Sequence, residues 1–157
     1  MVWLDNVLEH VADPAVLLRK AAQLTCEGGM LIIEVTNDYS SYQQALFDSQ
    51  KVNRKHWEAY PDHLAYFSRE SLISLRENMH WKTEKVISDF LIELLFINNH
   101  SGFCNDKSLG KQAHASRMFL EKFLEQATAK KYDLTGFYEA MSKMNQGRQI
   151  IGFFRKQ

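Results

Sequence analysis

The sequence has no excess of charge of either sign. Among its 157 residues, 19 are Lys or Arg and 19 are Asp or Glu, and they are scattered without a long block of one sign. Binding to nucleic acid or to an anionic membrane generally requires a strongly basic surface. The composition therefore predicts a protein whose partners include neither nucleic acid nor a membrane.

Long hydrophobic runs are also missing. The longest apolar stretch, FLIELLFI at Phe90–Ile97, is interrupted by Glu93, and it is far shorter than the roughly 20 residues that a membrane span needs. The opening MVWLDNVLEHVADP has neither the basic start nor the apolar segment of a signal peptide. We therefore expect a soluble, cytoplasmic protein.

Cysteine is scarce. Cys26 and Cys104 lie far apart and form no C-x-x-C motif, which argues against a zinc or redox motif. Two lone cysteines suit a reducing cytoplasm, and one disulfide between them remains open. We predict that both are small, buried, apolar side chains.

A strand–helix–strand unit opens the chain. The short apolar segment Val2–Val7 is ambiguous between strand and helix by itself, but Asp13 is a good N-cap and Pro14 suits the first helical position. The helix is expected to end at 27–29, where two glycines follow Glu27. The apolar run Met30–Val35 predicts a strand buried on both faces, as in a parallel sheet. Short connections make this a β-α-β unit of an α/β fold.

The rest of the chain predicts more helix than strand, in one domain over 1–157 without repeats or linkers. SYQQALFDSQKV suits a short helix, and Ser68 caps a helix that carries Leu72 on its apolar side. The expected later elements are a strand at 81–90, an amphipathic helix at 111–130, a shorter helix at 135–144 and a final strand, QIIGFFRK; 90–97 is open between strand and helix. An aromatic stripe is predicted to lie in the core, comprising Phe119, Phe123, Phe137 and Phe153.

Polar residues follow the first two predicted strands. Doubly wound sheets bind ligands beyond the carboxyl ends of their strands. The functional edge should therefore hold Asn6, Glu9, His10, Asn37 and Asp38.

Four segments together resemble a known family. NVLEHVADPAVLLRKAAQLTCEGGMLIIEVTN resembles the second half of a class I S-adenosylmethionine (SAM)-dependent methyltransferase, in which a LEHV-x-DP segment leads into a helix and the next strand ends near EVPN. PDHLAYFSRESL looks like the following His-containing loop, and GRQIIGFFRK looks like the last strand. The resemblance implies a partial Rossmann-like sheet, made of roughly the family's fourth to seventh strands with the last one antiparallel. Residues 98–146 would be a helical insertion on the substrate side.

The sequence departs from this family in one large respect. The family holds SAM mainly with its first half, where a strand leads into a G-x-G turn and an acidic residue ends the next strand. The seven glycines here, at 28, 29, 102, 110, 136, 147 and 152, form no G-x-G. We therefore expect an incomplete methyltransferase domain with an exposed apolar sheet edge. Such an edge favours a homo-oligomer or a partner chain that supplies the missing half.

The resemblance gives roles to the first polar segment. Asn6 and Glu9 would bind the cofactor beside its sulfonium, and His10 would be a general base for the acceptor hydroxyl. Some related ubiquinone-biosynthesis O-methyltransferases hold a divalent cation with acids here and have Glu where Asn6 stands. Because hard cations prefer charged oxygen ligands, we predict no metal. The alternative is that Glu9 and His10 only orient the turn.

Further residues are candidates for the acceptor site. Asn37 and Asp38 would bind the acceptor, or simply form a turn. His63, in YPDHLAYFS, would line the pocket or act as base, or be an ordinary packed histidine. Trp57 and Tyr60 would supply an apolar wall, or pack in the ordinary way.

An anion site is a further expectation. His114 and Arg117 share one helix face and, with Lys111 and Arg148, could bind a phosphorylated or carboxylated acceptor. The alternative is a solvated helix face.

Two functions from different classes follow. The first is methyl transfer from SAM to a hydroxyl or amine of a small molecule, with this chain alone inactive. The second is a catalytically incompetent remnant, or an assembly or regulatory subunit that associates through its exposed sheet edge. Another nucleotide-binding α/β protein is disfavoured, because no glycine-rich phosphate loop is present.

Overall fold

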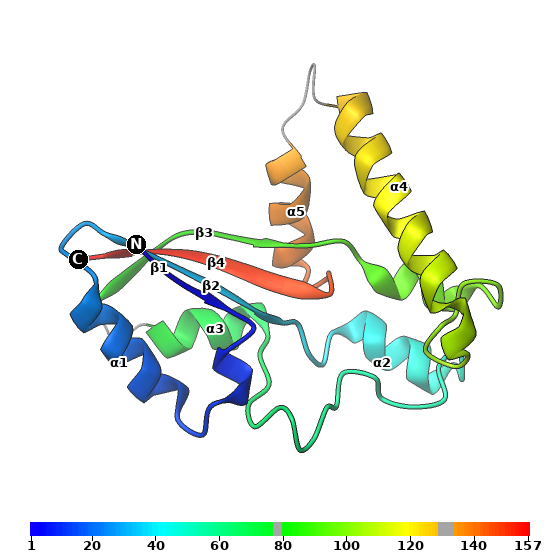
Figure 1. Ribbon diagram of the computed structural model, residues 1–157, viewed down its shortest axis with the longest axis horizontal. Coiled ribbons are helices and arrows are strands. Elements are labelled where there is room, and N and C mark those ends of the chain that lie inside the picture. The colour runs from blue at the N-terminus through cyan, green and yellow to red at the C-terminus, as the bar shows by residue number, and fades with distance from the viewer. Residues whose placement is uncertain (77–79, 129–133) are drawn as a thin grey trace.

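One mixed sheet runs through the centre of the molecule (Figure 1). In the computed structural model, which describes residues 1–76, 80–128 and 134–157, its strands lie in the order β1 (Val2–Asp5), β2 (Met30–Thr36), β4 (Gln149–Lys156) and β3 (Trp81–Ser88). β1 runs parallel to β2, whereas β4 runs antiparallel to both of its neighbours. The α/β class, the opening parallel pair and the antiparallel last strand are confirmed.

The helix of the β-α-β unit begins as the sequence predicts. α1 (Pro14–Leu24) has Asp13 as its N-cap, and the carboxylate of Asp13 accepts a hydrogen bond from the amide of Val16 at 3.0 Å. The helix ends earlier than expected, because Thr25 already has an extended backbone. Gly28 then adopts a φ of 72° in the turn that leads to β2, a conformation that glycine tolerates without strain.

The main core fills one face of the sheet. α1 and α3 (Arg69–Arg76) lie together on that face (Figure 1), and Ser68 caps α3 as predicted. The most deeply buried apolar members of this core are Leu8, Leu18, Leu31, Ile33, Val35, Leu72, Ile150 and Phe154. These side chains come from both ends of the chain, so the core joins them in a single unit.

The prediction that β2 is buried on both faces is wrong. Its side chains alternate, with Leu31, Ile33 and Val35 buried and the residues between them half-buried. On the opposite face, α5 (Leu134–Lys143) packs against β3, at the edge of the sheet farthest from β1. The apolar run therefore corresponds to a strand with one face fully buried and the other half-buried.

The helices beyond the sheet's carboxyl edge complete the structure. α2 (Ser41–Asp48) begins with a capping box of Ser40 and Gln43, and the segment left open by the sequence is a 3₁₀ helix, η2 (Ile92–Ile97). η1 (Leu8–His10) and η3 (Lys107–Leu109) are single 3₁₀ turns. α4 (Gly110–Thr128) confirms the predicted long helix; its expected end at Lys130 lies outside the described residues. No described helix has the length and apolarity that crossing a membrane takes.

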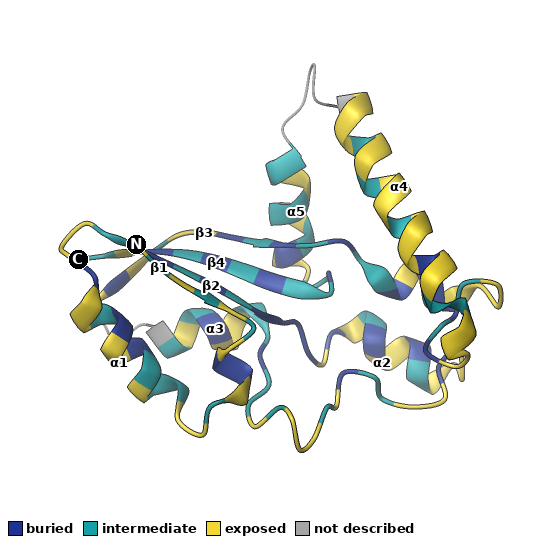
Figure 2. Cartoon of the chain, viewed as in Figure 1, coloured by how far each residue is buried: buried dark blue, intermediate teal, exposed yellow. Residues whose placement is uncertain are grey.

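The predicted aromatic stripe is not in the core. Phe119, Phe123 and Phe137 are 68%, 58% and 49% exposed, whereas Phe153 on β4 is half-buried. For Phe119 and Phe123 the cause is visible in Figures 1 and 2: α4 rises away from the sheet and is exposed along most of its length. Phe137 lies on α5 instead. Helical spacing identified the apolar side of α4, but that side faces solvent.

The two cysteines differ. Cys104 is buried, as predicted, whereas the prediction is wrong for Cys26, which is exposed in the turn after α1. Both are free thiols.

Candidate functional site

Asn6 closes the carboxyl end of β1. It has a φ of 49°, in the left-handed region that asparagine tolerates better than most residues. Its backbone N–H donates to the carbonyl of Glu34 on β2 at 2.9 Å. Its side-chain Oδ1 accepts from Gln149 Nε2 at 2.9 Å. Asn6 thereby ties β1 to β2 and to the start of β4. Its role toward a cofactor stays a prediction.

Glu9 lies in η1, the 3₁₀ turn that follows the carboxyl end of β1. It is fully buried, and within the described part of the chain neither carboxylate oxygen has a hydrogen-bond partner. Its backbone carbonyl accepts from the amides of Leu64 and Ala65 at 2.8 and 3.1 Å. An unpaired buried carboxylate is costly, so this group is held in place by the fold around it rather than by its own contacts.

His10 and His63 meet at the same place. Their ring centroids are 4.9 Å apart in an edge-to-face arrangement, although the residues are far apart in sequence. His10 Nδ1 lies 2.7 Å from the carbonyl oxygen of Asp62. Because a carbonyl only accepts, the contact assigns a proton to Nδ1, and in the neutral ring the lone pair is then on Nε2. The exposed His10 ring is therefore arranged to receive a proton.

These three residues also form a set that could hold a metal. One ligand atom from each of Glu9, His10 and His63 lies within 4.8 Å of the other two. Imidazole and carboxylate groups together suit divalent transition metals. The expectation that no metal binds at this segment stays a prediction.

Asn37 and Asp38 are both buried after β2. Asn37 Nδ2 donates to two carbonyls of the loop at 145–147. Asp38 Oδ2 accepts from Thr36 Oγ1 at 2.9 Å and from the amide of Phe67 at 3.3 Å, and burial raises the pKa of this carboxyl. Both side chains hold loops against the sheet edge. Their direct contact with an acceptor stays a prediction.

Trp57 and Tyr60 are placed very differently. Trp57 is buried, with edge-to-face contacts to Tyr39, Phe47 and His56. Tyr60 is 82% exposed. Of the two, Trp57 has the position that ordinary packing requires, and the role of the pair in binding an acceptor stays a prediction.

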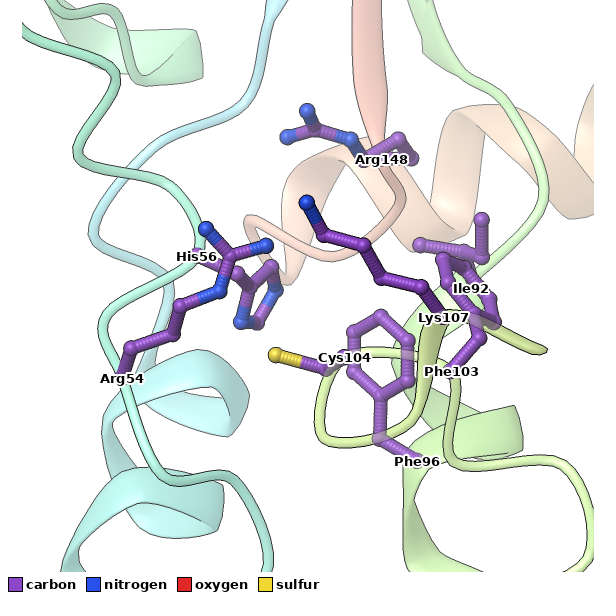
Figure 3. A pocket seen from close by; sticks show the side chains of 8 residues that line it. All are labelled: Arg54, His56, Ile92, Phe96, Phe103, Cys104, Lys107 and Arg148. Atoms are coloured by element: carbon purple, nitrogen blue, oxygen red, sulfur yellow. The ribbon is translucent and has the colours of Figure 1, made fainter. Parts of the chain in front are cut away.

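The predicted anion site is divided between two adjoining cavities. Arg148 lines a cavity of about 320 Å³ (Figure 3), whose other lining residues are Arg54, His56, Ile92, Phe96, Phe103, Cys104 and Lys107. His114 and Arg117 line a cavity of about 240 Å³ with Ile92, Leu95, Phe103 and Gly110. Lys111 is exposed on α4 and belongs to neither lining.

Sequence reasoning missed two cations of the larger cavity, Arg54 and Lys107. Arg54 lies beside Lys55 in a polar loop and Lys107 lies in η3, and no spacing joins the two to each other or to Arg148. In the smaller cavity, Arg117 Nε pairs with Glu121 at 3.2 Å, so its charge is partly neutralised.

A chain of buried polar contacts joins the sheet edge to the larger cavity. Gln43 Nε2 donates to the carbonyl of Asn37 at 2.9 Å and to Glu93 Oε1 at 3.1 Å. Glu93 Oε1 in turn lies 3.6 Å from His56 Nε2. Burial alone would raise the pKa of Glu93, but the contacts with His56 and Gln43 outweigh it and hold the pKa below its ordinary value. The wall of the cavity is thus fixed relative to the end of β2.

A family model matches the first part of the chain. The sequence profile of a family described as "Methyltransferase domain" (Methyltransf_23) matches residues 2–86, which is more than half of the chain and runs from β1 into β3. No curated protein matches the chain.

Proposed function

Because the chain belongs to the methyltransferase domain family, we propose that it forms the acceptor side of a SAM-dependent methyltransferase. The acceptor would be a small molecule that receives the methyl group on a hydroxyl or amine. The observation that carries the proposal is the histidine pair at the carboxyl ends of β1 and β2, where α/β sheets bind their ligands. β1 to β4 would correspond to roughly the fourth to seventh strands of the family.

The residues present fit SAM only in part. Asn6 has a polar side chain at this edge, and the buried Glu9 carboxylate behind it offers unused acceptors. A glycine-rich turn that would let the backbone approach the cofactor is absent from the sequence. Bound SAM supplies the methyl group; the contacts proposed for this chain are those of Asn6 and Glu9, from the acceptor side.

His10 is the proposed general base. Its Nδ1–H is held by the carbonyl of Asp62, so the free Nε2 can take the proton that the acceptor loses. His63 packs its ring against His10 and is the proposed positioning residue. General-base assistance of this kind contributes about 10²- to 10⁴-fold to a rate.

We also propose that a second polypeptide segment completes the cofactor site. Within the described residues, β1 pairs with β2 alone, and Trp3 on β1 is 59% exposed. A second copy of this chain could cover that edge, but it would bring no G-x-G turn. The missing turn would therefore come from a segment of different sequence that pairs along β1.

The proposal is tested by titrating S-adenosylhomocysteine calorimetrically into the chain at known oligomeric state. We expect no binding by the chain alone, and micromolar binding once a methyltransferase half with a G-x-G turn is supplied ahead of β1. Binding by the chain alone would contradict the need for a second segment. Absence of binding in both preparations would favour the alternative, an assembly subunit that associates through β1.

The completed site then tests the role of His10. His10→Gln should lower methyl transfer from SAM by about 10²-fold or more and leave S-adenosylhomocysteine affinity unchanged. His100→Gln is the matched control, because His100 is exposed in the segment after η2 and does not belong to the cluster of Glu9, His10 and His63. Activity that disappears with a chelator and returns with a divalent metal would assign the histidines to metal binding instead.

A further inference from the structure

We propose that the cavity lined by Arg54, Lys107 and Arg148 binds an oxyanion, carboxylate or phosphate, carried by a small molecule with an apolar body. Naming that molecule as the methyl acceptor rests on the proposed function, but its binding does not. The sequence alone had grouped Arg148 with residues of α4. The structure instead places it beside two cations from other loops.

The charges of the cavity are unbalanced. Arg54 comes from the loop after α2, Lys107 from η3 and Arg148 from the residue before β4. In the part of the chain that the structure describes, none of these three side chains forms an ion pair, and the cavity lining contains no carboxylate. Three cations that converge without a counterion favour an anionic ligand.

The orientation of the three cationic side chains also favours an anionic ligand. Figure 3 shows the charged ends of Arg54, Lys107 and Arg148 gathered on one side of the cavity. Nη1 of Arg148 is buried without a hydrogen-bond partner among the described residues. Asp38 interacts electrostatically with Arg148, but its carboxylate accepts hydrogen bonds from Thr36 and from the amide of Phe67. Glu93 is held by Gln43 and His56. Guanidinium groups suit carboxylates and phosphates because they donate two parallel hydrogen bonds.

The remaining walls are apolar. The rings of Phe96 and Phe103 pack edge to face, 4.9 Å between centroids, and Ile92 lies beside them. The cavity volume of about 320 Å³ is in the range of small-molecule sites. Ile92 and Phe103 also line the adjoining 240 Å³ cavity, so a ligand could extend from the cations along an apolar path. The pocket therefore fits a molecule that is charged at one end only.

The pocket is next to the proposed reaction edge. The amide of Asn37, the first residue after β2, donates to the carbonyl of Arg148 at 3.0 Å. A ligand anchored at Arg148 is therefore held against the end of β2, where its neutral end could approach the acceptor side of the site.

The test is a titration of the full chain followed by amide chemical shifts in NMR. The probes are phenyl phosphate, phenylacetate and the neutral analogue benzyl alcohol. We expect one or both anions to bind and to shift residues around Phe96 and Phe103, with benzyl alcohol at least roughly tenfold weaker because it lacks charge-assisted hydrogen bonds. Which anion binds more tightly identifies the oxyanion.

Variants locate the site. Arg54→Gln and Arg148→Gln should each weaken anion binding roughly tenfold; Arg54 is exposed, so its variant should keep the fold. Arg19→Gln, exposed on α1 at the other end of the molecule, is the matched control.

The proposal is overturned if neither anion binds, if benzyl alcohol binds equally well, or if Arg19→Gln loses as much affinity as Arg54→Gln. None of these results depends on SAM. Anion binding by the chain together with no methyl transfer by the completed domain would keep this pocket and remove the proposed function, and the reverse result would do the opposite.

Discussion

The main core and α4 show opposite outcomes of the same kind of sequence pattern. On the α1 and α3 face, apolar residues at helical and strand spacing meet in one buried core, with Leu18, Leu72 and Phe154 fully inaccessible. On α4, apolar residues at equally regular spacing remain in solvent, and Phe119 stacks on Phe123 with 6.2 Å between ring centroids. Periodicity thus identifies which side of a helix is apolar, whereas long-range topology decides whether anything covers it.

The largest expected effect comes from the packed face. Leu72→Ala should lower the free energy of unfolding by about 2–5 kcal/mol, because Leu72 is fully buried between α3 and β4 and truncation leaves a cavity. Urea denaturation followed by circular dichroism measures it. A loss below about 1 kcal/mol would mean that the core is packed less tightly than the structure shows.

A second, smaller effect is the pH dependence of stability that Asp89, the residue after β3, should cause. Burial raises the pKa of Asp89 to about 6, against the opposing contact with the Gln149 amide at 2.7 Å. The folded state then binds a proton more readily than the unfolded state, so stability from this group is present below pH 3.8 and is lost as pH rises to about 6.

The side chain in Asp89→Asn cannot ionise, so the variant should not lose this contribution to stability as the pH rises. The unfolding free energy of the variant relative to the wild type should therefore increase between pH 4 and pH 7, by at most about 3 kcal/mol. Urea titrations of both proteins at each pH measure the difference. A difference that stays constant with pH would show that Asp89 is solvated.

The smallest expected effect is on the exposed helix α4. Phe123→Ser should change the unfolding free energy by no more than about 0.5 kcal/mol, because the side chain is mostly exposed and no core is disturbed. The same urea experiment checks it beside Leu72→Ala. A loss comparable to that of Leu72→Ala would erase the contrast, and it would show that α4 is covered in solution.

Much of the fold was predictable because local signals agreed. The Asp13 cap, the Ser68 cap and the strand QIIGFFRK are all present, and this strand runs antiparallel as the family resemblance implied. The errors lie where non-local packing decides. The apolar run of β2 does not show that the residues on one of its faces are only half-buried. The apolar spacing of α4 does not show that Phe119 remains exposed to solvent.

The rule that ligands bind at strand ends named Glu9 and His10, and the family resemblance added His63. The structure brings one ligand atom of each within 4.8 Å of the other two, while their roles stay predictions. The cationic cavity was not predictable, since Arg54 and Lys107 are brought to Arg148 by tertiary structure alone. The sequence had instead grouped Arg148 with Lys111 and with the helical pair His114 and Arg117, and this pair lines the adjoining cavity.

The position of β4 has a kinetic consequence. β4 is the strand between β2 and β3, yet it follows β2 by more than a hundred residues. Until residues 149–156 leave the ribosome, β2 and β3 have no strand to join them. The sheet must therefore form late and through distant pairings, which slows folding and prolongs the exposure of strand edges to other nascent chains.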